Sequence, residues 1–342
     1  MMLSKSLCEK SENEITESWR YADKVYISVV CTTYNQELYI SDAINSFLEQ
    51  ITDYRFEIII HDDASTDRTT EIIKDFETKY PSLIRVIIQK ENQYSKGGFR
   101  PLMYASRFAC GECISFCEGD DFWVDPYKLN DQYEVLLRNS DVSLVYTACN
   151  YYHVDSDSYK LVDNTNIDIN FETLIKNNYI ATLTVMLRSK YIDEFYSKYK
   201  LIPGSNKWRM GDYPLWLFLL LRGRSSSISR TTAVYRVFEN SASHSNNKDK
   251  NLEFYLSSIR MRIDMVRFFL PKDQNLLRCL INKYLFTVLL EGETIDKNYT
   301  KPASLKYVIF LKINNYISLN YIMKKIQSIK RMLYEKVNEK VN

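Results

Sequence analysis

The chain has 342 residues, of which 45% are hydrophobic and 26% charged, and its formal net charge is +2. This balance is typical of a globular protein and excludes a disordered one, and the near-neutral charge gives no indication of nucleic-acid binding. The length allows one large core or two moderate ones. No run of roughly 18 apolar residues occurs, so no segment is expected to cross a bilayer.

Cysteine usage and the first residues of the chain favour a cytoplasmic protein. The seven cysteines are odd in number and lie mostly in apolar runs, which is typical of a reducing compartment. Residues 1–24 are polar and charged, unlike a secretory signal. Cys110 and Cys113 have the spacing of a zinc knuckle, but no second pair follows them, so a structural zinc site is not expected.

The first part of the chain alternates between strand and helix patterns. Apolar strands are expected at 26–32, 56–61, 83–89 and 113–117, with amphipathic helices after the first three. Ser65, Thr66 and Asp67 are alternative N-caps for the second of these helices. Repeated strand–helix units predict an α/β fold, with a mixed, mostly parallel sheet flanked by helices.

Polar clusters follow three of these strands, at 33–37, 62–67 and 118–121. In open parallel sheets, ligands bind beyond the carboxyl ends of the strands, where the strand order reverses. Independent polar surface loops are the alternative interpretation. Three clusters at three strand ends favour a single crevice that all of them face.

The third cluster contains three carboxylates within four residues, which repel one another unless a positive charge lies between them. Such hard oxygen ligands suit Mg²⁺ or Mn²⁺ shared with a phosphate, and Gly119 allows a ligand to approach closely. A solvated acidic turn is the alternative, but Phe122 and Trp123 follow at once and favour a site. A second Asp-x-Asp, at Asp155 and Asp157, is expected at the tip of a hairpin instead.

The later patterns complete one domain and then change character. Helices are expected at 127–139, 191–199 and 215–221, a hairpin at 151–162, and strands at 142–147, 180–187, 225–230 and 233–238. From about residue 250 only helices are expected, at 252–270 and 276–291. We therefore expect a polar extension at 1–23, a main domain at 24–248 and a helical region at 249–342.

The last part of the chain is basic. Residues 301–342 carry nine Lys or Arg against two Glu. Two interpretations remain open for this segment. It can lie as an amphipathic helix on anionic lipid at the cytoplasmic membrane face, or pack on the main domain with a solvated basic face.

Four stretches together resemble the family-2 glycosyltransferases, which have the GT-A fold. They are VYISVVCTTYNQELYI (25–40), EIIIHDDASTDRT (57–69), CEGDDFW (117–123) and MGDYPLW (210–216). The resemblance covers residues 24–245, about two-thirds of the chain. Each motif is weak alone, whereas all four in this order are specific.

The resemblance implies roles in binding a nucleotide-diphosphate sugar, most often a UDP-sugar. Asp62 and Asp63 match an acidic pair in which one carboxylate, here Asp63, accepts a hydrogen bond from the base. Residues 235–244 match a closing segment that approaches the diphosphate. Phe238 stands where the family commonly has His, so the contact falls to Arg236 or His244, and a salt bridge at the strand edge is the alternative for Arg236. The loop that wraps the base and ribose is matched by Thr33, Tyr34, Asn35 and Glu37.

The resemblance also implies a divalent cation and a general base. Asp120 matches the metal ligand, with Asp121 as a second candidate that could instead cap the next turn. Glu118 stands where the family has Asp, towards the ribose, so its longer side chain leaves its role open. Asp212 matches the general base, and an N-cap of the following helix is the alternative interpretation.

The implied activity is the transfer of one sugar to a hydroxyl of a glycan or lipid-linked acceptor, in cell-surface polysaccharide synthesis. One base without a protein nucleophile implies inversion at the anomeric carbon. The Gln-x-x-Arg-Trp motif of processive synthases is absent from the sequence, which favours single addition. The alternative is a non-catalytic nucleotide-sugar-binding scaffold, for which Asp212 would be dispensable.

Overall fold

The computed structural model describes residues 8–98, 100–239 and 247–303, which form two compact units. The first unit contains the described residues up to Leu201 and from Met210 to Glu239. The second contains Ile202–Arg209 and the described residues from Asn247 onward. The segment Ile202–Arg209 therefore interrupts the first unit in sequence.

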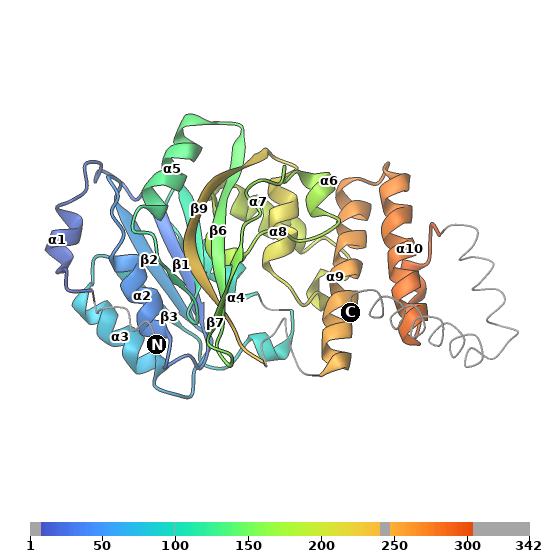
Figure 1. Ribbon diagram of the computed structural model, residues 1–342, viewed down its shortest axis with the longest axis horizontal. Helices are drawn as coiled ribbons and strands as arrows, with labels where there is room; N and C mark the ends of the chain where they lie inside the picture. The colour runs from blue at the N-terminus through green and yellow to red at the C-terminus, as the bar shows by residue number, and fades with distance from the viewer. Residues whose placement is uncertain (1–7, 99, 240–246, 304–342) are drawn as a thin grey trace, which may run out of the picture. The chain divides into compact units, whose positions relative to one another are not determined.

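The first unit is built on one mixed sheet (Figure 1). Its strands are β1 (Ile27–Thr33), β2 (Phe56–Asp62), β3 (Ile84–Ile88), β4 (Cys113–Glu118), β5 (Phe122–Trp123), β6 (Val142–His153), β7 (Ser158–Val162), β8 (Met186–Arg188) and β9 (Arg224–Val237). Its helices are α1 (Glu12–Thr16), α2 (Ile40–Leu48), α3 (Thr69–Lys79), α4 (Pro101–Ala105), α5 (Lys128–Arg138), α6 (Phe171–Leu174), α7 (Lys190–Tyr199) and α8 (Asp212–Leu219).

The strand order places β1 at a switch point. The order is β3-β2-β1-β4-β8-β6-β9-β5, with β7 paired to β6, and β1 to β4 run parallel. From β1 the chain moves outward to β2 and β3 and then returns to the other side of β1 as β4. The carboxyl ends of β1 and β4 therefore lie where open α/β sheets bind ligands. The expected α/β fold with a mixed sheet is confirmed.

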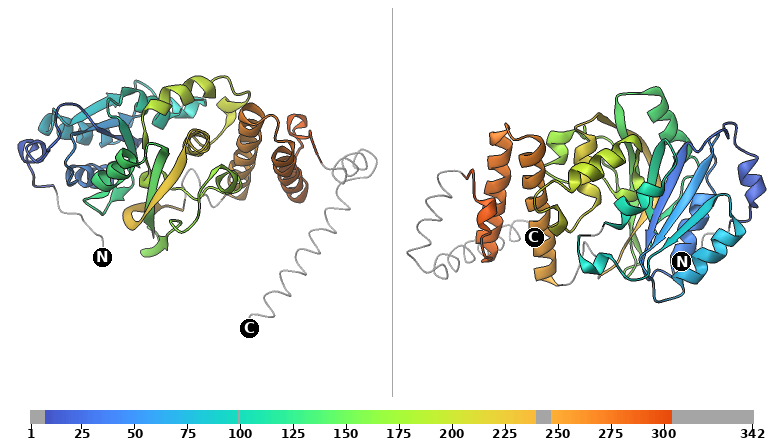
Figure 2. Two further views of the ribbon diagram at one scale, coloured as in Figure 1. Left: turned by 90° about the horizontal axis from the view of Figure 1, so that it is seen from above. Right: turned by 180° about the vertical axis from the view of Figure 1, so that it is seen from behind.

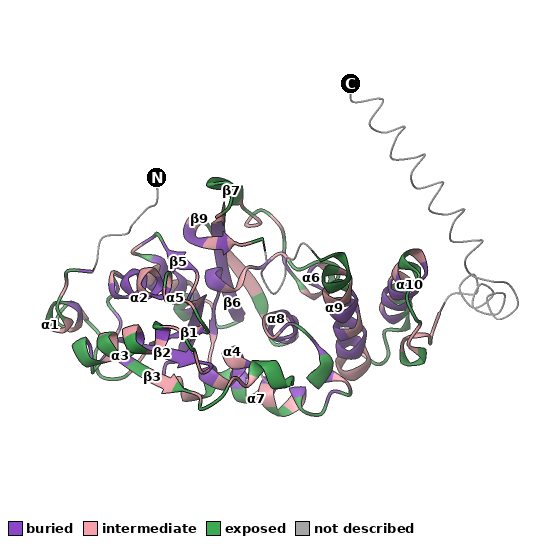
Figure 3. Ribbon diagram, turned by 90° about the horizontal axis from the view of Figure 1, so that it is seen from below, coloured by how far each residue is buried: buried purple, intermediate pink, exposed green. Residues whose placement is uncertain are grey.

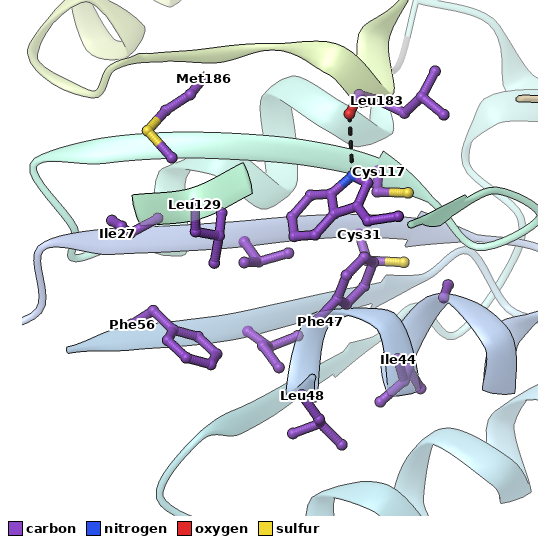
Figure 4. Close-up of a cluster of buried hydrophobic side chains, with 14 of the residues drawn as sticks. Ile27, Cys31, Ile44, Phe47, Leu48, Phe56, Cys117, Leu129, Leu183 and Met186 are labelled. Carbon is purple, nitrogen blue, oxygen red and sulfur yellow. Dashed lines mark hydrogen bonds between the residues drawn. The ribbon is translucent and has the colours of Figure 1, made fainter. Parts of the chain in front are cut away.

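The core on one face of the sheet joins the parallel strands to α2 and α5. Ile27, Val29 and Cys31 of β1 belong to this cluster, and Figure 4 shows Ile27 and Cys31 near Phe47 of α2. The centroids of the Phe47 and Trp123 rings lie 4.7 Å apart. The alternate residue Val30 is also fully buried, on the opposite face, where α4 contacts β1 and β2. The strands β1 and β2 are thus buried on both sides, as Figure 3 shows.

Four predicted elements differ from the structure. The strand expected at 180–187 is a 3₁₀ turn, Thr182–Thr184, followed by the short β8. The two strands expected at 225–230 and 233–238 are one strand, β9, because it follows β6 along its length with irregular register (Figure 2). The helix expected from 215 begins three residues earlier, at Asp212.

The second unit contains α9 (Lys248–Phe269) and α10 (Gln274–Glu291). The two helices contact each other and bury apolar residues such as Ile263 and Ile281. Within the described ranges, none of the helices combines the length and the apolar character needed to cross a bilayer. Of the basic segment 301–342, residues 304–342 lie outside the described part of the chain, so membrane contact there stays a prediction.

A buried carboxyl group ties the segment Ile202–Arg209 to α9. Asp264 is 6% exposed, and its Oδ2 accepts hydrogen bonds from the indole of Trp208 (3.1 Å) and the hydroxyl of Tyr299 (2.9 Å). Burial raises the pKa of Asp264 to about 6, although both hydrogen bonds oppose the rise. The folded chain therefore holds this proton more tightly than an unfolded chain, in which the pKa of Asp is about 3.9.

The contribution of Asp264 to stability should fall as the pH rises from 5 to 7. In this window the folded state binds more protons than the unfolded state, so the free energy of unfolding decreases with pH. Urea unfolding of the wild type and of Asp264→Asn, which keeps an acceptor oxygen, should show their stability difference change by about 1 kcal/mol between these pH values. A difference that stays constant with pH would contradict the raised pKa.

Candidate active site

The polar clusters that follow β1, β2 and β4 lie at one edge of the sheet. Thr33 pairs with Asp62 in the β1–β2 register, and Thr32 pairs with Glu118 in the β1–β4 register. The three strands therefore end within one residue of each other. The expectation that residues 33–37, 62–67 and 118–121 share one edge is confirmed.

The loop after β1 is hydrogen-bonded to the loop after β2. The Asn35 backbone N–H donates to Ser65 Oγ (2.9 Å), and Asn35 Oδ1 accepts from the Thr66 N–H (2.7 Å). Further along the two loops, Glu37 Oε2 accepts a hydrogen bond from the Arg68 N–H (2.9 Å). Asn35 and Glu37, both predicted to bind the donor, thus also hold the two loops together. Tyr34, in the loop after β1, is 44% exposed.

The acidic pair Asp62 and Asp63 orders the loops that follow. Asp62 is fully buried and accepts hydrogen bonds from Ser65 and from the hydroxyl of Thr70. The two oxygens of Asp63 accept from the backbone N–H groups of Gln93 and Tyr94, each at 2.9 Å. Both carboxylates are therefore satisfied within the protein, and the contact of Asp63 with a base stays a prediction.

The start of α3 differs from the expected capping. Its N-cap residue is Arg68, which makes no side-chain capping bond. Of the three candidates, Asp67 lies just before the cap, and its Oδ1 accepts from the Thr69 N–H at 2.9 Å.

The acidic turn after β4 packs tightly against the loop after β1. A Cβ atom on Gly119 would lie 2.6 Å from Gln36 Oε1 and 2.9 Å from Thr33 Oγ1, so a side chain there would have to displace these two side chains. Burial raises the pKa of Asp120, and a hydrogen bond from the Gln36 side chain opposes the rise. Glycine at 119 thus lets the two loops approach closely without moving Gln36.

The carboxyl groups of the acidic turn are crowded and incompletely satisfied. Asp121 is fully buried; its Oδ1 accepts from the Arg236 backbone N–H at 2.7 Å, whereas its Oδ2 has no partner in the described residues. Glu118 Oε2 is likewise buried and has no hydrogen-bond partner among the described residues. Burial, Asp120 and Glu118 raise the pKa of Asp121 well above its usual range.

These residues fit a divalent cation. Two buried carboxylate oxygens have no hydrogen-bond partner among the described residues, and burial, followed by repulsion between the carboxylates, raises the pKa values of Glu118 and Asp121. A cation would stabilise such groups. Among the described residues, no three His, Cys, Asp or Glu side chains are already arranged around a common metal position. A cation would therefore need ligands from water or from a phosphate as well, as Mg²⁺ commonly does.

Arg236 holds the acidic turn from β9. It is 7% exposed, its guanidinium donates to the Asp120 carbonyl (2.7 Å) and forms an ion pair with Asp42 of α2. It also lies over the Phe122 ring, 4.5 Å from the centroid. Its guanidinium therefore has partners within the protein, and its predicted contact with a diphosphate stays a prediction. His244 lies outside the described residues.

Asp212 lies beside the acidic turn although it is far away in sequence. It is the first residue of α8, and its Oδ2 accepts from the Thr182 hydroxyl at 3.1 Å. Burial raises the pKa of Asp212. Hydrogen bonds from the Tyr213 backbone N–H and from Thr182 oppose this rise because they stabilise the charged form. Asp212 and Glu118 are close enough that Asp212 helps to raise the pKa of Glu118, after burial and Asp120.

The edge of the sheet thus unites the predicted carboxylates of the turn with Asp212. Thr182, which contacts Asp212, was not among the predicted site residues. Its segment has the alternating pattern of a strand, and a lone threonine in such a pattern carries no signal. This arrangement can bind a cation with an anionic ligand and place a carboxylate near it as a proton acceptor.

Comparisons with known proteins agree with this architecture. The family model "Glycosyl transferase family 2" matches residues 28–196. An uncharacterised protein of Mycobacterium tuberculosis is 32% identical over 226 residues, 66% of this chain and 62% of that relative. The chain thus spans less than two-thirds of the length of that relative.

A second relative is matched over most of its length. The Escherichia coli protein WfaP, named a UDP-Glc:alpha-D-GlcNAc-diphosphoundecaprenol beta-1,3-glucosyltransferase, is 31% identical over 228 residues, 66% of this chain and 82% of WfaP. The crystal structure of S. aureus TarS 1-349 in complex with UDP has a TM-score of 0.55 at 18% identity, covers 80% of this chain and 77% of that chain, and shows the same fold. The chain belongs to glycosyltransferase family 2 and has the expected GT-A fold.

Proposed function

We propose that this protein is an inverting glycosyltransferase that moves one sugar from a nucleotide-diphosphate sugar, preferably UDP-linked, to a hydroxyl of a lipid-linked or glycan acceptor. The observation that carries the proposal is the position of Asp212, next to the carboxylates that follow β4 at the switch point of the sheet. Family membership and the glucosyltransferase name of WfaP support this class of reaction.

The acidic turn would bind the diphosphate through a divalent cation. Asp120 and Asp121 would hold Mn²⁺ or Mg²⁺, and the cation, when bound, offsets the negative charge that grows on the leaving diphosphate. Arg236 keeps the turn in place through the Asp120 carbonyl and its own backbone N–H. Glu118, the last residue of β4, would approach the ribose.

Asp212 would act as the general base. The acceptor hydroxyl needs a proton acceptor within hydrogen-bond reach as it attacks, and a carboxylate whose pKa is raised accepts a proton more readily. We assign none of the site residues as a protein nucleophile. Direct attack by the acceptor inverts the configuration at the anomeric carbon.

The nucleotide would lie on the loops after β1 and β2. The base and ribose would be surrounded by Thr33, Tyr34, Asn35 and Glu37, and Asp63 would face the base. Asn35 and Glu37 also hydrogen-bond the loop after β2. The structures of TarS with UDP and with UDP-GlcNAc support a uridine nucleotide for this fold.

The acceptor class follows from the relatives. The name of WfaP specifies a diphosphoundecaprenol-linked acceptor, which supports a lipid-linked acceptor and a role in cell-surface polysaccharide synthesis for this chain. Such an acceptor lies in a membrane, and the basic segment 301–342 would bring the enzyme to its cytoplasmic face as a peripheral protein.

The alternative is a scaffold that binds a nucleotide sugar without turnover. The loops after β1, β2 and β4 would be needed for both functions, whereas a proton acceptor is needed only for transfer. Asp212 therefore separates the two proposals.

Asp212→Asn should lower turnover sharply and keep donor binding. Loss of a general base lowers kcat by about 10²–10⁴-fold, while the isosteric amide leaves the nucleotide site in place. Transfer from UDP-sugars is measured by release of UDP, and UDP binding by calorimetry. The matched control is Asp157→Asn, the same change at the exposed tip of the β6–β7 hairpin. Near-full activity of Asp212→Asn would remove Asp212 from the base role.

Mn²⁺ should strengthen the binding of UDP. Titration of the full chain with UDP, with and without Mn²⁺, should give a Kd at least about tenfold lower with the metal, because the cation bridges carboxylate and diphosphate. Asp121→Asn should lose most of this difference, since an amide is neutral yet can still accept from the Arg236 N–H. Equal affinities with and without Mn²⁺ would contradict the proposed metal site.

A further inference from the structure

Thr182 joins the two parts of the site that come from distant segments. Its hydroxyl donates to Asp212 Oδ2 at 3.1 Å. Burial raises the pKa of Glu118, and a hydrogen bond from the same Thr182 side chain opposes that rise. It opens the 3₁₀ turn Thr182–Thr184, between the acidic turn on β4 and the start of α8. A hydrogen bond to one oxygen of a carboxylate restricts the rotation of that carboxylate.

The turn that carries Thr182 is fixed through its own backbone. The carbonyl groups of three consecutive residues each accept a hydrogen bond from a different buried side chain. These bonds are Trp123 Nε1 to Leu183 (3.1 Å), Gln132 Nε2 to Thr184 (2.8 Å) and Ser115 Oγ to Val185 (3.0 Å). Three bonds in a row leave this stretch of backbone little freedom.

A single buried lysine contacts all three donors. Lys128 is fully buried, and its Nζ donates to Gln132 Oε1 (2.7 Å) and Ser115 Oγ (2.9 Å) and lies 4.4 Å from the Trp123 ring centroid. Because the amide oxygen of Gln132 accepts from Lys128, its NH₂ group must face the turn. Because the Ser115 oxygen accepts from Lys128, its proton is available for Val185.

Burying a lysine costs free energy that an apolar residue would not cost. Here the buried amine orients two donors that a methionine or leucine could not orient. We propose that Thr182 is the positioning residue for Asp212, and that the Lys128 cluster (Lys128, Ser115, Trp123 and Gln132) holds the turn of Thr182 in place. The inference rests on the proposed role of Asp212 as the base.

The test uses three variants of the full chain. Thr182→Val keeps the shape and removes the hydroxyl. It should lower kcat about tenfold and change the Kd for UDP much less, because the Thr182–Asp212 hydrogen bond lies outside the loops proposed to bind the nucleotide. Thr182→Ser keeps a hydroxyl and should restore most of kcat. The matched control is Thr147→Val, which removes a buried hydroxyl bonded to Thr232 at 2.7 Å, and it should leave kcat unchanged.

A double-mutant cycle decides whether Thr182 acts through Asp212. In the Asp212→Asn background, Thr182→Val should cause no further loss of kcat, since there is no carboxylate left to position. Lys128→Met should lower kcat in the wild type and add little in the Thr182→Val background. If Lys128→Met does not fold, the Thr182 variants decide alone.

The outcomes separate the inference from the proposed function. Full kcat in Thr182→Val, failure of Thr182→Ser to restore kcat, or an additive loss in the Asp212→Asn background would each overturn the inference while the transferase proposal stands. Full kcat in Asp212→Asn would overturn both, because a non-essential carboxylate needs no positioning residue.

Discussion

The site depends on the repulsion between carboxyl groups that the sheet brings together. Asp120, Asp121 and Glu118 follow β4, and Asp212 comes from the start of α8. Burial raises the pKa values of all four, and neighbouring carboxylates raise those of Glu118 and Asp121 further. The protein offsets this cost only in part, through the backbone N–H and guanidinium of Arg236 and through the Thr182 hydroxyl. A bound cation would offset the remaining imbalance and could in turn hold an anionic ligand.

Much of this arrangement could be predicted from the sequence. The strands β1, β2 and β4 are apolar runs that are buried on both faces, and such runs stand out against their polar ends. Because parallel neighbours end at one edge, the clusters at 33–37, 62–67 and 118–121 could be placed together without coordinates. Asp212 could be assigned only through the resemblance, since nothing in Gly-Asp-Tyr-Pro alone separates a base from a helix start.

The rest could not be predicted because it depends on contacts between distant residues. Thr182 lies in an alternating apolar stretch, and only the hydrogen bonds of its turn to Trp123 and Gln132 stop that stretch from continuing as a strand. The pairing of Arg236 with Asp42 joins residues that are 194 positions apart. Likewise, the single strand β9 follows from its pairing with β6, which no local pattern in either segment reveals.

The interruption of the first unit by Ile202–Arg209 has a consequence for synthesis of the chain. Trp208 is made before the helix that supplies its partner Asp264, so the segment ending three residues before Asp212 stays unanchored until α9 has left the ribosome. A chain that ended after β9 would therefore contain Trp208 without the carboxyl group that its indole contacts.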